Sequence, residues 1–131
     1  MSSADEAMIK DKIIHGTKEW YENILSIKRL NNNLVMGVDE CVSVNVPDYH
    51  KTTGVAADVI IYVTAGQTDD SAVGWAAVCA LTSDRYPAAG RLHLESQAFK
   101  SSSFEDILST SIHEVAHILA FNSELYSYFT T

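Results

Sequence analysis

The residues with the clearest chemical potential lie near the C-terminal end of the chain, in the segment His113-Glu114-Val115-Ala116-His117. This H-E-x-x-H spacing is typical of zinc-dependent peptidases. Two residues four apart on a helix lie one turn above each other, so both imidazoles can reach one metal ion. The segment therefore predicts zinc ligands at His113 and His117, with Glu114 as the base that accepts a proton from metal-bound water.

The surrounding sequence predicts the helix that this spacing requires. Ser103 and Asp106 form a capping-box pattern, and the helix is expected over residues 104–119. At about 100° per residue the apolar side chains fall in one arc and the two histidines on the opposite side. The alternative is a pair of solvent-exposed histidines placed by chance. The expected core face consists of Phe104, Leu108, Ile112, Val115 and Leu119.

A catalytic zinc site normally has three protein ligands and one open position, and the motif supplies two. A glycine three residues after His117 and a third histidine at the sixth would fall on Ala120 and Ser123, and neither residue fits. Glu124 is a conceivable carboxylate ligand, although a solvated charge is the simpler interpretation. The remaining histidines are isolated in the sequence and are expected on the surface or in loops: His15, His50 and His93.

The elements that must position this motif lie upstream. Apolar residues at helical spacing predict one amphipathic helix over residues 5–30, with Gly16 as the candidate point of interruption, followed by a turn at residues 31–33. Residues 34–38 and 42–46 are short β-prone runs. The continuous β-branched run at residues 58–64 predicts a strand that is buried on both faces and central in a sheet.

Two further segments complete the expected sheet. Residues 73–81 are rich in small side chains, which suit an edge strand, and residues 82–90 with Pro87 predict a turn. The alternating pattern of residues 91–95 predicts a half-buried strand. The order of helix, strands and helix predicts an α/β or α+β sandwich of one sheet and two long helices.

Composition limits the functional class. The 131 residues are 47% hydrophobic and 20% charged, which is globular and fits one domain or part of one. The net charge of -8 argues against a nucleic-acid partner, and no apolar run is long enough for a transmembrane segment. The mixed charges of the first residues do not predict a signal peptide. Two cysteines, Cys41 and Cys79, allow one disulfide or two buried thiols.

In these features the chain resembles the leishmanolysin family of zinc metallopeptidases, in the metzincin clan. The resemblance covers about residue 10 to the end and includes loop residues as well as the metal motif. The tail, residues 122–129, is similar to versions from ciliates and other protists. The matching positions include Cys41, Pro47, His50, Gly54, residues 58–63, Trp75, Cys79, Asp84, Pro87, Gly90 and residues 113–121.

The resemblance implies the N-terminal subdomain of a metzincin-like catalytic domain that spans residues 1–131. Its fold is a twisted, mostly parallel sheet with an antiparallel edge strand, a backing helix and an active-site helix. A peptide substrate would add to the edge strand at Gly74, Trp75, Ala76 and Ala77, where small residues allow a close main-chain approach. The alternative is an ordinary small-residue strand.

The resemblance also implies a zinc ion as cofactor, protein or peptide substrates, and a C-terminal half of the catalytic domain as partner. It pairs Cys41 with Cys79 in a disulfide that would contribute about 4 kcal/mol and argue for an extracellular or cell-surface location. Two buried thiols are the alternative.

Three departures from the family qualify this interpretation. Ala120 replaces a glycine, which predicts either a strained positive φ or a helix that simply continues. The family's third histidine and methionine turn belong to a C-terminal subdomain and are not expected within residues 1–131, and neither a signal peptide nor an inhibitory propeptide is expected in this sequence. The main hypothesis is therefore the N-terminal part of a zinc endopeptidase. The alternatives are a non-catalytic remnant that at most binds metal or peptide, and a metal-free helical interaction module.

Overall fold

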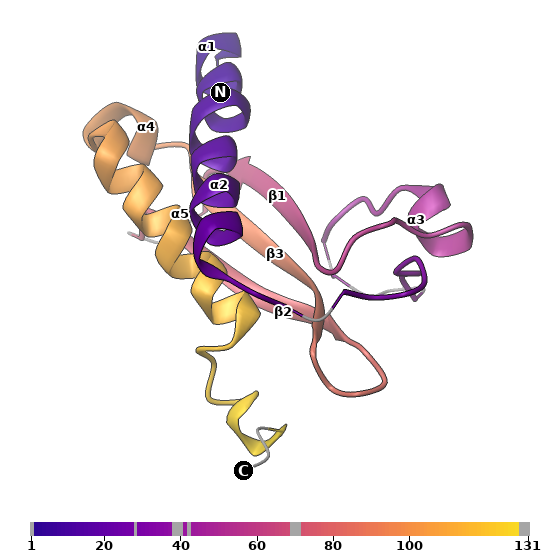
Figure 1. The fold of residues 1–131 in the computed structure, drawn as a ribbon. Coiled ribbons are helices and arrows are strands. Elements are labelled where there is room, and N and C mark those ends of the chain that lie inside the picture. Colours follow the sequence, from indigo (N-terminus) through magenta and orange to yellow (C-terminus); the bar gives the residue numbers. More distant parts are fainter. Residues whose placement is uncertain (1, 28, 38–40, 42, 69–71, 129–131) are drawn as a thin grey trace.

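The computed structural model describes residues 2–27, 29–37, 41, 43–68 and 72–128 (Figure 1). Helices and one sheet build an α+β fold, as the sequence predicts. The helices are α1 (Ser3–Met8), η1 (Ile9–Ile14, a π-helix), α2 (His15–Ile24), α3 (Asp48–Thr52), α4 (Ala98–Ser101), α5 (Phe104–Leu119) and η2 (Tyr126–Tyr128, a 3₁₀-helix). The strands are β1 (Ile60–Gly66), β2 (Gly74–Leu81) and β3 (Pro87–Glu95).

The three strands form a mixed sheet in the order β1-β3-β2. Strand β1 runs parallel to β3, with Thr64 opposite His93, and β2 runs antiparallel to β3, with Trp75 also opposite His93. The predicted antiparallel edge strand is therefore confirmed as β2. The prediction that residues 58–64 form a central strand is wrong, because β1 pairs only with β3 within the described residues.

Strand β1 is apolar on both faces because each face packs against a different part of the chain, and not because the strand is central in the sheet. One side, with Ile61 and Val63, packs on the helices, and the other side, with Ile60 and Tyr62, packs on the irregular segment before the strand. Both faces of an edge strand are thus covered. The central strand is β3, which is buried along most of its length, so the expected half-buried strand and the expected turn over residues 87–90 are corrected. The turn lies earlier, where the amide of Thr82 bonds the carbonyl of Tyr86 at 2.7 Å.

Helices α2 and α5 lie side by side on one face of the sheet (Figure 1). The core between η1, α5 and β3 contains Ile13, Leu92, Leu94, Ile107 and Val115. The N-terminal helical run continues through the π-helix into α2 without a break at Gly16, and it ends at Ile24 rather than at residue 30. None of the helices in the described part of the chain is long and apolar enough to cross a bilayer.

The segment between α2 and β1 packs against the opposite face around Met36, Val46 and Tyr62. Leu34 forms an isolated antiparallel bridge with Val55, so the β-prone run at residues 34–38 yields one bridge among its described residues. Residues 38 and 42 lie outside the described part, and residues 43–46 are not a strand.

The core face of α5 differs from the expected one. The buried residues are Ile107, Ser111, Val115 and Ile118, whereas Phe104 is exposed. Of the predicted arc only Val115 is fully buried, and Leu108, Ile112 and Leu119 are half-buried. The buried stripe includes Ser111, whose hydroxyl accepts a 2.9 Å hydrogen bond from the hydroxyl of Thr17 on α2. A polar side chain can therefore occupy the middle of the helix interface.

Candidate metal centre

Helix α5 begins at the predicted cap and ends at the predicted residue. The Ser103 hydroxyl accepts from the Asp106 amide at 3.1 Å, and the Asp106 carboxylate accepts from the Ser103 amide at 3.3 Å. This reciprocal pair satisfies amide donors that the first turn would otherwise leave free. Since the cap fixes the start and the buried face fixes the rotation, the direction in which the histidines point is also determined.

The helix is held unusually close to the sheet at Gly90 of β3. A Cβ atom at Gly90 would lie 2.4 Å from Cγ2 of Ile118 and 2.8 Å from its Cδ1 and Cγ1. Such distances are far inside van der Waals contact, so the glycine is required for this packing. Ile118 follows His117 directly, and the contact therefore anchors the helix turn that carries the second histidine.

The structure brings the imidazoles of His113 and His117 together. Their Nε2 atoms lie 3.1 Å apart, and the ring planes meet at 85°. The second imidazole is also tied to the main chain, because its Nδ1 lies 2.5 Å from the carbonyl oxygen of Phe121. His113 is exposed and His117 half-buried, so the pair faces away from the core and is accessible to an ion.

Glu114 lies between the two histidines in sequence and is half-buried. Among the described residues its carboxylate forms no hydrogen bond or ion pair with another side chain. The role of Glu114 in the chemistry of the motif stays a prediction.

A third metal ligand does not come from the described part of the chain. No group of three His, Cys, Asp or Glu side chains within it converges on one point. The amide of Glu124 donates to the side chain of Asn122 at 3.0 Å, and its carboxylate does not join the histidines. Ala120 has φ -162° and ψ -37°, so the helix stops without the positive φ that the family glycine suggests. Neither of the two expectations for Ala120 is met.

In the edge strand β2 the glycine is explained by packing within the sheet and not by the approach of a substrate main chain. A Cβ at Gly74 would lie 2.7 Å from the main-chain oxygen of His93, so the strand's own neighbour requires the glycine. Trp75 stacks on the His93 ring at 5.1 Å, with the Arg91 guanidinium 4.7 Å from its centroid. Ala76 is half-buried and Ala77 is exposed. The glycine thus serves packing within the sheet, and a role of these four residues in substrate binding stays a prediction.

Sequence reasoning missed a buried polar cluster on β3. It expected His93 on the surface, but the side chain is buried beside buried Glu95, with Nε2 and Oε1 3.4 Å apart. Thr64 bonds the other ring nitrogen at 2.9 Å. Burial lowers the pKa of His93, whereas hydrogen bonds from the Thr68 hydroxyl and amide lower the pKa of Glu95. The only sequence pattern at this position is the alternation of residues 91–95, and this pattern does not show that the second face of the strand is covered.

His50 is a second correction. It was expected in a loop or on the surface, yet it is buried in α3, and its Nδ1 lies 2.7 Å from the hydroxyl of Tyr62. His15 is exposed, as expected. Neither histidine lies in a metal-binding group of the described residues.

The sulfur atoms of Cys41 and Cys79 are joined in a disulfide with 4.6 Å between the Cα atoms. The bond ties the segment before α3 to β2, at the point where the β2–β3 register shifts between Val78 and Ala80. It therefore restrains the edge strand on the face of the sheet that is opposite the helices.

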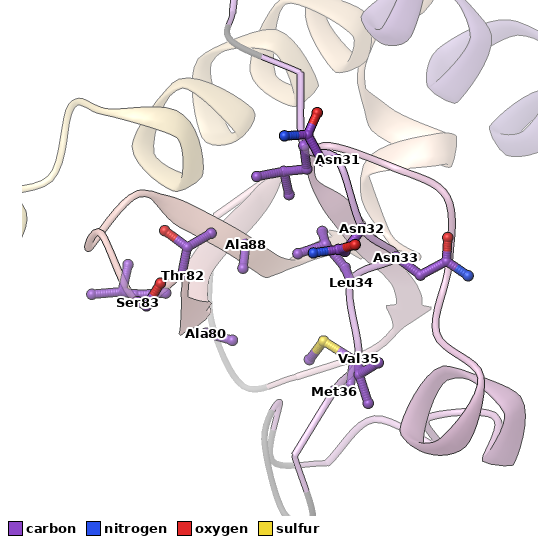
Figure 2. Close-up of a pocket in the computed structure, with 12 residues that line it drawn as sticks. Asn31, Asn32, Asn33, Leu34, Val35, Met36, Ala80, Thr82, Ser83 and Ala88 are labelled. Carbon is purple, nitrogen blue, oxygen red and sulfur yellow. The ribbon is translucent and has the colours of Figure 1, made fainter.

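Two cavities lie outside the histidine pair. One of about 410 Å³ opens between residues 30–36 and the ends of β2 and β3, with Asn32, Leu34 and Ala88 along its sides (Figure 2). The other, of about 750 Å³, lies under α2 and is lined by apolar residues such as Val63 and by charged residues such as Glu22 and Asp58. Neither lining includes His113, Glu114 or His117.

Comparison with known proteins agrees with these observations. The leishmanolysin peptidase family matches residues 3–131. Leishmanolysin of Leishmania chagasi is 31% identical over 88 residues, which cover 66% of this chain and 15% of that protein. Leishmanolysin of Leishmania amazonensis is 29% identical over 92 residues (70% and 15%), and a leishmanolysin homolog of Crithidia fasciculata is 27% identical over 88 residues (66% and 14%).

These matches cover only a small part of each relative, and this limits the conclusion that they support. The alignments span about 15% of the length of the relatives, so they establish kinship for this segment and not the activity of a whole protein. The family match nevertheless extends over almost all of the chain. The chain therefore belongs to the leishmanolysin family of metallopeptidases.

Proposed function

We propose that this chain is part of the catalytic domain of a zinc-dependent endopeptidase and holds two of the zinc ligands, His113 and His117. The observation that carries the proposal is the 3.1 Å separation of their Nε2 atoms. Two nitrogen ligands of a tetrahedral zinc ion lie about 3.4 Å apart for Zn–N bonds of the usual length. The imidazole pair is thus close to the arrangement that the ion requires, and the donor type suits zinc.

Each residue of the motif has a distinct role in this proposal. A bound zinc ion supplies a Lewis acid that lowers the pKa of a coordinated water towards about 7. His113 and His117 hold the ion through Nε2. Glu114 accepts the proton of the attacking water and donates it to the amine that leaves when the peptide bond breaks. Its lack of a partner among the described residues supports this role, because no competing donor must first be displaced.

The third ligand and the lower wall of the cleft are assigned to polypeptide outside these 131 residues. Two observations support a partial domain: no third ligand converges among the described residues, and the alignments span about 15% of the relatives. Residues 1–131 would then supply the sheet, the backing helix and the active-site helix.

The proposed substrates are proteins or peptides. Among the described residues strand β2 pairs with β3 along one edge only, and an extended peptide can add to the other edge by main-chain hydrogen bonds. Gly74, Trp75, Ala76 and Ala77 are the residues proposed to meet it. The disulfide between Cys41 and Cys79 supports an extracellular or cell-surface location, because disulfides persist in oxidising compartments.

The activity is tested in a longer polypeptide that contains this chain and the length its relatives have. Glu114→Gln is expected to lower peptide hydrolysis by at least about 10²-fold while zinc content stays unchanged, since the proton acceptor is lost and the ligands remain. Glu19→Gln on α2, an exposed glutamate, is the matched control. Equal turnover of the Glu114→Gln and Glu19→Gln variants would refute the role of Glu114.

A non-catalytic remnant is the second candidate, favoured by the missing third ligand among the described residues. Zinc titration of the 131-residue chain separates the possibilities. A two-histidine half-site gives micromolar or weaker binding that His113→Ala abolishes and His15→Ala leaves intact. A tight one-to-one site would show a third ligand within the chain. A metal-free helical module would show no binding and no response to chelator.

A further inference from the structure

The hydrogen bond at Nδ1 of His117 determines where that imidazole carries its proton. The acceptor is the main-chain oxygen of Phe121 at 2.5 Å, and a carbonyl oxygen can only accept. The ring nitrogen must therefore be the donor, which assigns the proton to Nδ1. In the neutral ring the lone pair then lies on Nε2, the atom that faces His113.

The Phe121 carbonyl reaches His117 because the chain turns back after α5. The helix ends at Leu119, and Ala120 leaves the helical conformation with φ -162°. The amides of Ala120 and Phe121 both donate to the carbonyl of Ala116 at 3.0 Å. The amide of Asn122 donates to the carbonyl of Ala120 at 2.9 Å and closes the turn.

A continuing helix would not provide this contact. Carbonyl groups in a helix point towards its C-terminus, whereas side chains lean towards its N-terminus. The carbonyl of residue 121 would therefore point away from the side chain of residue 117. The non-helical turn is the feature that delivers the acceptor, and Ala120 is the residue at which the chain departs from the helix.

We propose that the turn of residues 120–122 is a positioning element for the metal centre, in which the Phe121 carbonyl fixes His117 as the Nδ1–H tautomer and presents its Nε2 lone pair to the ion. This inference rests on the proposed zinc site. Ligand histidines are commonly oriented by a carbonyl or carboxylate on the second nitrogen, and loss of that partner typically weakens metal binding about 10–100-fold.

The same geometry makes the two histidines unequal before metal binds. With the lone pair of His117 on Nε2, the 3.1 Å contact requires His113 to donate from its own Nε2. Metal binding then leaves the tautomer of His117 unchanged. For His113 to hold the ion through Nε2, its proton would have to lie on Nδ1.

Nitrogen-15 NMR of the histidine-labelled, metal-free chain tests the assignment directly. The expected result is a protonated Nδ1 for His117 and a protonated Nε2 for His113. A protonated Nε2 on His117 in the neutral ring would overturn the proposal. This readout needs no variant, no metal and no enzymatic activity.

A matched pair of variants at Ala120 tests the role of the turn. Proline cannot adopt φ near -162° and lacks the amide that donates to Ala116, whereas glycine retains both. Proline is common just after helix ends, so the fold should survive, and circular dichroism verifies this. Ala120→Pro is expected to give mixed His117 tautomers and about 10–100-fold weaker zinc binding than Ala120→Gly.

The outcomes distinguish this inference from the proposed function. Equal zinc affinities and an unchanged His117 tautomer in a folded Ala120→Pro variant would overturn the role of the turn. If the unaltered chain shows the expected tautomers but the longer polypeptide that contains it binds no zinc, the hydrogen-bond assignment is supported and the zinc function is refuted. If Ala120→Pro does not fold, the tautomers of the unaltered chain decide the assignment.

Discussion

Replacement of Gly90 by alanine tests whether contact with the sheet sets the position of the metal-binding helix. The added Cβ would lie 2.4 Å from Cγ2 of Ile118, and carbon atoms pack at about 3.5–4.0 Å. The helix and the strand must therefore separate locally by about 1 Å. Ile118 is completely buried, so it cannot turn into solvent to relieve the overlap.

The expected cost of Gly90→Ala is about 1–3 kcal/mol in the free energy of unfolding, measured by urea denaturation. The residue has no positive φ, so the cost arises from space and not from the backbone. Gly66→Ala is the matched control on β1. Its Cβ would meet only Cε1 of His93, at an ordinary 3.7 Å, and stability should change by less than about 0.5 kcal/mol.

A double-mutant cycle assigns the cost to one contact. Ile118→Ala removes all three overlapping atoms and alone should cost about 2–5 kcal/mol as a cavity. In the double variant the new Cβ at residue 90 enters the vacated space, so the two changes should cost at least about 1 kcal/mol less than their sum. Additive costs, or a Gly90→Ala chain as stable as the unaltered one, would refute the reasoning.

Two further predictions concern the sheet and its connections. The Cys41–Cys79 disulfide closes a loop of 39 residues counted inclusively. Its reduction should lower the free energy of unfolding, measured by urea titration, by about 4 kcal/mol. The double variant Cys41→Ser/Cys79→Ser should show no response to reductant. The pKa of His93 is lower in the folded chain than in the unfolded chain, so the unfolded chain binds a proton at this residue more readily and stability should fall as pH drops below 6.5. The pKa of Glu95 is also lowered in the folded chain, which adds a further loss of stability below pH 4.5. His93→Gln should flatten the upper part of this profile, and an unchanged slope between pH 7 and 5 would contradict the assignment.

The parts of the fold that the sequence predicted are those with local causes. Helix α5 begins and ends where the Ser103–Asp106 cap and the apolar spacing place it. The antiparallel edge strand followed from the family resemblance. Both histidines of the motif share one side of α5 because a spacing of four residues is nearly one helical turn.

The errors concern partners that are distant in the sequence. The β-branched run of β1 correctly indicated burial on both faces, but burial does not reveal how many strands pair with it. Likewise, Ser111 can occupy the helix interface because its partner, Thr17, lies 94 residues away. His93 is buried because β3 is central and its second face is covered. None of these contacts has a signature in the local sequence.

The candidate site also has one part with local causes and one part that depends on distant residues. The histidine pair is determined within one helix and the turn that follows it, so it forms without the rest of a catalytic domain. A third ligand must come from residues that are distant in the chain or outside it, and the described residues supply none. Two imidazoles can hold an ion weakly, but they leave two coordination positions open and do not fix the water beside Glu114. Zinc affinity and catalysis should therefore separate: the affinity of this chain depends on His113, His117 and the turn at Ala120, whereas turnover requires the third ligand.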